Sequence, residues 1–282
     1  MNKKIQTARL SIYSNVSLIV LKLIAGMLSG SVSIISEAIH SGMDLLASII
    51  AFFSVKVSDT PPDKEHPYGH GKFENVSGVI EAILIFVAAG WIVIEAIEKL
   101  HKPTSIEAIG IASLVMFISG VVNFLVSRRL YKVARETDSI ALEADALHLK
   151  TDVYTSLGVG VGLLLIWFTG YTFLDPVVAI MVALFIIRES YFLLRNAYTP
   201  LLDTSLSEKE IEIIKNTIIE HNQTFHDLKT RKSGQFRFAE LHLEMDGVTP
   251  LQTVHDQCDN IEESIKQKIK NIEINIHVEP KA

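Results

Sequence analysis

The sequence has a single cysteine, Cys258, among its 282 residues, so no disulfide can form within the chain. A free cysteine is usually buried, and core packing is the expected role of Cys258. The scarcity of thiolates also disfavours Cu(I), which prefers sulfur ligands. The His-Glu-x-x-His pattern of many zinc hydrolases is absent as well, so the sequence does not predict a metallohydrolase.

Long polar stretches are missing from most of the chain. Apolar residues make up 49% of the sequence and the mean hydropathy is +0.32, which indicates a membrane protein. The last 80 residues differ, because they contain 10 basic and 15 acidic residues and no long apolar run. We therefore expect a transmembrane domain over residues 1–202, with a polar loop at 58–75, and a water-exposed domain over residues 203–282. The acidic balance of the second domain argues against nucleic acid as a partner.

Six apolar segments are long enough to cross a bilayer, which takes about 20 residues. They are Ile12–Leu28, Val32–Val57, Val76–Ile97, Ile106–Val126, Leu142–Phe168 and Leu174–Leu194. An even number of spans places both termini on one side. Lys and Arg gather at the segment ends on that side, and by the positive-inside rule this predicts cytoplasmic termini.

The last 80 residues alternate between two periodicities. A capping box at Ser207 and Glu210 opens an amphipathic helical pattern, and a second helical pattern follows Pro250. Three segments favour strands: "HDLKTRKSG", "FAELHLEMD" and "IEINIHVEP". The order is helix, strand, strand, helix, strand. It predicts an α+β domain with two helices on one face of a sheet.

One pattern occurs twice, in the second and the fifth apolar segments. It reads acid-Ala-aliphatic-His-x3-Asp-x3-Ser and places His40 and Asp44 in one segment and His148 and Asp152 in the other. Residues four apart share a helix face, and an Asp at membrane depth persists when it faces the bundle interior with a partner. Two imidazoles and two carboxylates are a complete tetrahedral ligand set for zinc. The alternative is two unrelated pairs, one in an interhelical hydrogen bond and the other at the membrane interface.

Two further groups contain residue types that bind metal. Asp63, His66 and His70 stand close together in the loop after the second segment. The last domain contributes His226, His242, His255, His277 and Glu279, of which His242, His277 and Glu279 fall on the polar faces of their strands. The alternative for both groups is ordinary surface histidines.

These features together resemble the cation diffusion facilitator family of proton-coupled divalent-metal exporters. The resemblance rests on the six spans, the two His/Asp pairs, "HPYGHGK" after the second span, and "HDLKTRKSG", "LHLEM" and "INIHVEP" near the end. It implies a homodimer held largely through a metallochaperone-like, regulatory cytoplasmic domain. It also implies a transport site at His40, Asp44, His148 and Asp152, a loop site at Asp63, His66 and His70, and a tail site at His226, His242, His255, His277 and Glu279. Glu279 stands where close bacterial relatives usually have Asp.

The expected activity is export of zinc from the cytoplasm in exchange for protons, in the plasma (inner) membrane and without a prosthetic group. Ligands bind metal only when deprotonated, so protons and metal compete for the same atoms. Imidazole and carboxylate suit zinc and also admit iron, manganese, cadmium or cobalt as cargo. A membrane-bound metal sensor without transport is the alternative from another class of protein.

Overall fold

The structure, a computed structural model, describes residues 3–29, 32–101, 111–171 and 173–281, without the side chains of some helical residues such as Glu37 and His40. The chain forms two compact units, Met1–Tyr198 and Thr199–Ala282.

The first unit consists of six long helices. They are α1 (Lys3–Ser29), α2 (Val32–Ser58), α3 (Lys72–His101), α4 (Ile111–Thr137), α5 (Ile140–Thr169) and α6 (Leu174–Tyr198). The shortest has 25 residues, and at 1.5 Å per residue even this helix spans about 37 Å. The hydrocarbon core of a bilayer is about 30 Å thick. Within the described residues, three segments are both long and apolar enough to cross it: Lys3–Ala25, Lys72–Glu98 and Pro176–Leu202.

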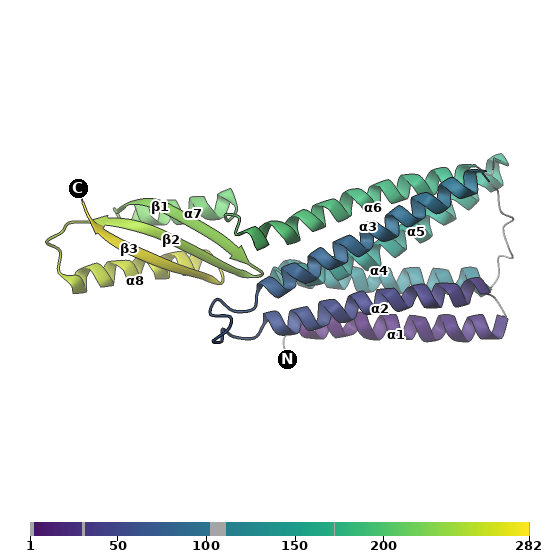
Figure 1. Cartoon of the computed structure of the whole chain (residues 1–282), viewed down its shortest axis with the longest axis horizontal. Coiled ribbons are helices and arrows are strands. Elements are labelled where there is room, and N and C mark those ends of the chain that lie inside the picture. The colour runs from purple at the N-terminus through teal and green to yellow at the C-terminus, as the bar shows by residue number, and fades with distance from the viewer. Residues whose placement is uncertain (1–2, 30–31, 102–110, 172, 282) are drawn as a thin grey trace. The chain divides into compact units, whose positions relative to one another are not determined.

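The six helices pack side by side, as Figure 1 shows. Helix α1 packs against α2 and α4, α3 packs against α6 and α5, and α4 packs against α5. Glycine allows α5 and α6 to approach closely, because a Cβ atom on Gly158 would lie 2.8 Å from a methyl group of Val182. Small residues are a usual means of helix packing where lipid removes the hydrophobic driving force.

A stripe of large apolar side chains covers the outer face of α3. Ile83, Val87, Trp91 and Ile94 follow helical spacing, and Trp91 is 70% exposed. A continuous exposed apolar surface of this kind indicates contact with lipid. Polar side chains such as Glu81 and Asp145 are instead buried inside the unit.

The second unit is an α+β domain. After the short 3₁₀ helix η1 (Thr199–Leu202) come α7 (Glu208–Glu220), β1 (Thr224–Ser233), β2 (Phe236–Met245), α8 (Leu251–Lys268) and β3 (Ile272–Pro280). The predicted capping box is present: Ser207 accepts a hydrogen bond from the backbone of Glu210, whose side chain accepts one from Ser207. The strand order is β1-β2-β3, with β1 antiparallel and β3 parallel to β2.

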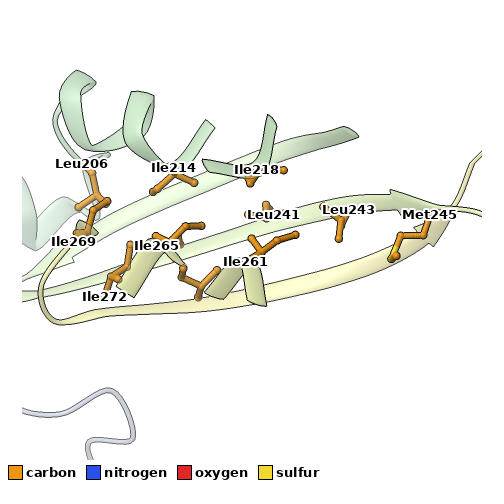
Figure 2. Packing of buried hydrophobic residues seen from close by; sticks show 12 residues of the cluster. Leu206, Ile214, Ile218, Leu241, Leu243, Met245, Ile261, Ile265, Ile269 and Ile272 are labelled. Atoms are coloured by element: carbon orange, nitrogen blue, oxygen red, sulfur yellow. The ribbon is translucent and has the colours of Figure 1, made fainter. Parts of the chain in front are cut away.

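Both helices of this unit pack on one face of the sheet (Figure 2). Ile214 and Ile218 of α7 and Ile261 and Ile265 of α8 are fully buried there. The sheet contributes the odd-numbered residues of β2, and Cys258 packs at the edge of this core, half-buried. The even-numbered residues of β2, including His242, therefore point to the opposite face.

The predicted helical domain and the αββαβ domain are confirmed, and the described residues of the helical unit form six long helices. The helices extend past the predicted apolar spans, most of all at two ends: α1 begins at Lys3 and α4 ends at Thr137. Hydropathy missed these ends because polar residues alternate there with the buried residues Ala8, Leu130 and Val133, which extend the packed core past the apolar runs. The predicted start of the fourth span, Ile106, lies outside the described residues.

Candidate metal sites

An imidazole and a carboxylate from the repeated pattern meet inside the helical unit. Nε2 of His148 on α5 lies 3.0 Å from Oδ1 of Asp44 on α2. Asp44 is 5% exposed, and Nδ1 of His148 is buried without a hydrogen-bond partner among the described residues. A buried ring nitrogen without a partner is costly unless something else occupies it. The pair therefore fits a site that receives a further ligand, such as a metal ion.

The other carboxylate of the pattern has a partner that sequence reasoning missed. Asn123 of α4 donates a hydrogen bond from Nδ2 to Oδ2 of Asp152, at 3.2 Å. Asn123 is itself 7% exposed. Its position within an otherwise apolar run was the one available signal. This bond holds Asp152 on the side of α5 that faces α4. The side chain of His40 lies outside the described ones, although its backbone is part of α2.

The loop between α2 and α3 brings Asp63, His66 and His70 together. One ligand atom from each lies within 4.8 Å of the others. The backbone N–H groups of His66 and Glu65 donate to Oδ1 of Asp63, at 2.7 and 2.9 Å. Gly69, with φ of +80°, provides the left-handed turn that directs His70 back toward Asp63.

The electrostatics of this loop suit a cation. The hydrogen bond from the His66 amide is the largest cause that lowers the pKa of Asp63, so the carboxylate stays ionised. Nε2 of His70 lies 3.3 Å from Oδ2 of Asp63, and Nδ1 of His70 is buried without a hydrogen-bond partner among the described residues. The three residues offer the mixed nitrogen and oxygen ligands that zinc and similar ions prefer.

The sheet of the second unit aligns three histidines in one row. His226 of β1 pairs with His242 of β2, which pairs with His277 of β3. Oxygens of Glu279 lie 3.2 Å from Nε2 of His226 and 2.9 Å from Nδ1 of His242. One ligand atom each from His226, His242 and Glu279 lies within 4.8 Å of the other two, and Nε2 of His277 is 3.6 Å from Glu279.

His255 does not join this cluster within one chain. It lies on α8, is exposed, and its Nε2 is 3.5 Å from Asp259 of the same helix. The reason is the packing of α8, because Ile261 and Ile265 turn the opposite side of the helix toward the sheet. The helices cover one face of the sheet and the three histidines occupy the other.

The long helices and the exposed apolar stripe on α3 are typical of an integral membrane protein. The clusters of imidazole and carboxylate groups are of the kind that bind metal ions. Residues 8–202 match the cation efflux transmembrane domain, and residues 206–281 match the cytoplasmic domain of cation efflux proteins. The chain belongs to the cation diffusion facilitator family. It is accordingly a transporter for the efflux of divalent metal cations and not an enzyme, and its cytoplasmic domain is of the dimer-forming type.

Individual relatives resemble the chain over most of its length. It is 35% identical over 278 residues to the uncharacterized transporter sll1263 of Synechocystis sp., covering 97% of this chain and 89% of that protein. It is 30% identical over 265 residues to the cation-efflux pump FieF of Pectobacterium atrosepticum, covering 93% and 88%. Among solved structures, the metal-bound C-terminal domain of the CzcD transporter from Thermotoga maritima is 25% identical, with a TM-score of 0.25, covering 27% of this chain and 94% of that one.

Proposed function

We propose that the chain exports zinc from the cytoplasm in exchange for protons, by alternating access to a site between α2 and α5. The observation that carries this proposal is the 3.0 Å approach of His148 to Asp44, buried within the helical unit. His40 and Asp152, one helical turn from Asp44 and His148 respectively, complete a set of two imidazoles and two carboxylates. Four such ligands make a closed tetrahedral site.

The coupling follows from the chemistry of these ligands. An imidazole binds metal only in its neutral form, and a carboxylate only when ionised. A site open to the cytoplasm loses protons and binds zinc, and a site open to the other side gains protons and releases zinc. Imidazole changes charge near neutral pH, so modest proton gradients suffice to bias this exchange. Magnesium and calcium prefer six or more oxygen ligands and fit poorly.

We propose in addition a role for each domain and a place in the cell. Residues 1–202 form the transport domain with its metal-binding loop 58–75, and residues 203–282 form a regulatory domain that holds two chains together. The transporter lies in the plasma membrane with both termini in the cytoplasm. Metal bound in the loop and on the sheet favours the conformation that accepts further metal.

Zinc uptake into proteoliposomes with an imposed pH gradient tests the proposal. We expect the gradient to accelerate transport in the wild type. Asp44→Asn and Asp152→Asn keep the size of each side chain but remove the charge, and transport should fall at least about tenfold. Glu98→Gln removes an exposed carboxylate from α3 and is the matched control, with no change expected.

Two results would contradict the proposal. Wild-type uptake that ignores the pH gradient would exclude proton coupling, and normal transport by both Asp variants would exclude this site. Repeating the assay with iron, manganese, cadmium and cobalt identifies the cargo, because all of these ions accept the same ligands.

A further inference from the structure

Two carboxyl groups outside the transport ligands are buried where α3 meets α5. Glu81 of α3 and Asp145 of α5 are each 0% exposed. Their sequence neighbours Ala82 and Ala144 belong to one apolar cluster, which brings the two helices together at this level. Both carboxyl groups therefore belong to the same buried contact between α3 and α5. Glu81 and Asp145 are called the acidic pair below.

Each member of the acidic pair has one satisfied oxygen and one without a partner. Ser48 donates a hydrogen bond to Oδ1 of Asp145 at 2.7 Å, and Ser77 donates to Oε1 of Glu81 at 3.2 Å. Oδ2 of Asp145 and Oε2 of Glu81 are buried without a hydrogen-bond partner among the described residues. No described basic side chain makes an ion pair with either carboxyl group. Two fully buried carboxylates at one helix contact, without a cation partner among the described residues, are costly to keep ionised together, so we expect the pair to hold a proton.

A polar track connects Asp145, one member of the acidic pair, to the transport site. Ser48, which donates to Asp145, shares a hydrogen bond of 2.9 Å with Ser11 and accepts one of 2.8 Å from Asn15. Nδ2 of Asn15 also lies 3.4 Å from the backbone oxygen of Asp44. These contacts of α1 link the backbone of Asp44 to the carboxyl group of Asp145 over a short, buried path.

The ionisable groups around Asp145 are few. Glu81 of α3, Asp44 of α2 and His148, one turn further along α5, interact with it electrostatically. Among the described side chains, helix α1 contributes the uncharged Ser11 and Asn15 to this region. Near Glu81, Ser190 of α6 donates a hydrogen bond to the backbone oxygen of the next residue, Ala82. The metal site is therefore the main variable charge beside the acidic pair.

We propose that Glu81 and Asp145 form a proton-binding site that works with the transport site, an inference that rests on the proposed antiport. A divalent ion arriving at Asp44 and His148 brings positive charge next to Asp145. A proton held by the pair then leaves as H⁺ to water on the side to which the site is open, and the carboxylate left behind compensates part of the metal charge. When the metal departs, the pair takes up a proton again.

Counting protons released per bound zinc ion tests this site directly. The measurement uses the full-length protein in weakly buffered detergent solution with a pH indicator, in a background of His70→Ala and His242→Ala that removes loop and tail binding. Asp145→Asn and Glu81→Gln mimic the protonated side chains in size, so both variants should fold. We expect each to bind zinc and to release about one proton fewer per ion than the background protein.

The controls separate this site from a purely structural role. Glu98→Gln should leave the proton count unchanged, and Asp145→Glu should restore it, because it returns an ionisable group. An unchanged count in both amide variants would overturn the inference. Should Asp145→Asn fail to fold, Glu81→Gln decides, since Glu81 is not part of the track through Ser48.

The uptake assay and the proton count together distinguish failure of the acidic pair from failure of the proposed antiport. If wild-type zinc uptake ignores a pH gradient, the antiport itself is wrong. If the wild type responds to the gradient while the amide variants release as many protons as the background, only the acidic pair is excluded. A fall in gradient-driven uptake with retained zinc binding in the amide variants supports the pair as a proton site.

Discussion

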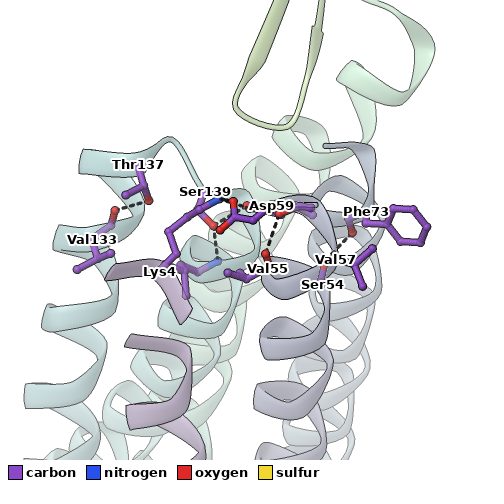
Figure 3. Close-up of polar contacts among 12 residues, drawn as sticks. Lys4, Ser54, Val55, Val57, Asp59, Phe73, Val133, Thr137 and Ser139 are labelled. Carbon is purple, nitrogen blue, oxygen red and sulfur yellow. Dashed lines mark hydrogen bonds and ion pairs between the residues drawn. The ribbon is translucent and has the colours of Figure 1, made fainter. Parts of the chain in front are cut away.

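Removal of Glu74 should destabilise the helical unit more than removal of any exposed carboxylate. Glu74 begins α3 and is 1% exposed. It accepts hydrogen bonds from Lys4 at 2.9 Å, Ser58 at 2.8 Å and Ser139 at 2.5 Å, and so joins α1, the end of α2 and the start of α5. Lys4, 2% exposed, also pairs with Asp59 at 2.7 Å (Figure 3).

The loss of stability in Glu74→Ala depends on which charged groups lose their partner. Removing one partner of a buried ion pair usually costs about 3–5 kcal/mol, because the other charge is left without compensation. In Glu74→Ala the ammonium of Lys4 keeps Asp59, so we expect the lower end, about 3 kcal/mol. For a unit of this size that is a fall in Tm of about 6–12 °C. Glu74→Gln keeps the shape and should cost less.

The assay is thermal unfolding of the purified protein in detergent, followed by tryptophan fluorescence. Glu136→Ala is the matched control, since Glu136 pairs with Lys3 at the surface of the same unit, where both side chains are more than a third exposed. Exposed pairs contribute little, and Tm should barely change. A Glu74→Ala protein that melts within about 2 °C of the wild type would refute the reasoning.

Three further predictions concern the other charged groups. The hydrogen bond from the His66 amide lowers the pKa of Asp63, so this carboxylate is already ionised near neutral pH. Asp63→Asn should therefore weaken zinc binding in the loop by the same factor at about pH 6 and at about pH 7. Calorimetry measures this binding. Burial opposes ionisation of Glu210, but hydrogen bonds, chiefly from Arg237 at 2.6 Å, outweigh it and lower its pKa. The stability from ionised Glu210 is therefore present above the usual glutamate range and lost as pH falls through the lowered value. Glu210→Gln should cost about 1 kcal/mol at about pH 7 in urea unfolding followed by circular dichroism, and the difference from the wild type should vanish in acid. Glu279→Ala should weaken zinc binding on the sheet at least about tenfold, with Glu279→Asp less affected, and equal affinities would exclude Glu279 as a ligand.

Much of the arrangement was predictable from local periodicity. A spacing of four puts His148 and Asp152 on one face of α5, and strand alternation puts His242 and Glu279 on the face of the sheet opposite its core. The geometry of one helix or strand is enough for these placements. Asp44 was expected on a buried face because an isolated charge inside a membrane requires a partner, and it is 5% exposed.

Contacts between distant segments were not predictable in the same way. The hydrogen bond from Asn123 to Asp152 and the pairing of Lys4 with Glu74 depend on which helix packs against which, and at what rotation. Apolar runs do not encode this, since lipid-facing and helix-facing positions are equally apolar. The same limit applies to His255, whose direction follows from the packing of α8.

The buried acids of the helical unit fall into three electrostatic situations, and each admits a different role. Glu74 has a permanent cation partner, Lys4, which it shares with Asp59, so it keeps an ion pair at any ordinary pH and it serves structure. Asp44 faces His148, whose charge depends on protons, so the balance can be restored by either a proton or a metal ion. Asp145 makes no ion pair with a described basic side chain, and inside a membrane domain a proton held by the acidic pair or a positive charge at the neighbouring metal site can balance it. Metal binding at the transport site and proton loss from the acidic pair are therefore linked by charge balance. Together they leave the net charge of the interior nearly unchanged while the transport site switches its access from one side of the membrane to the other.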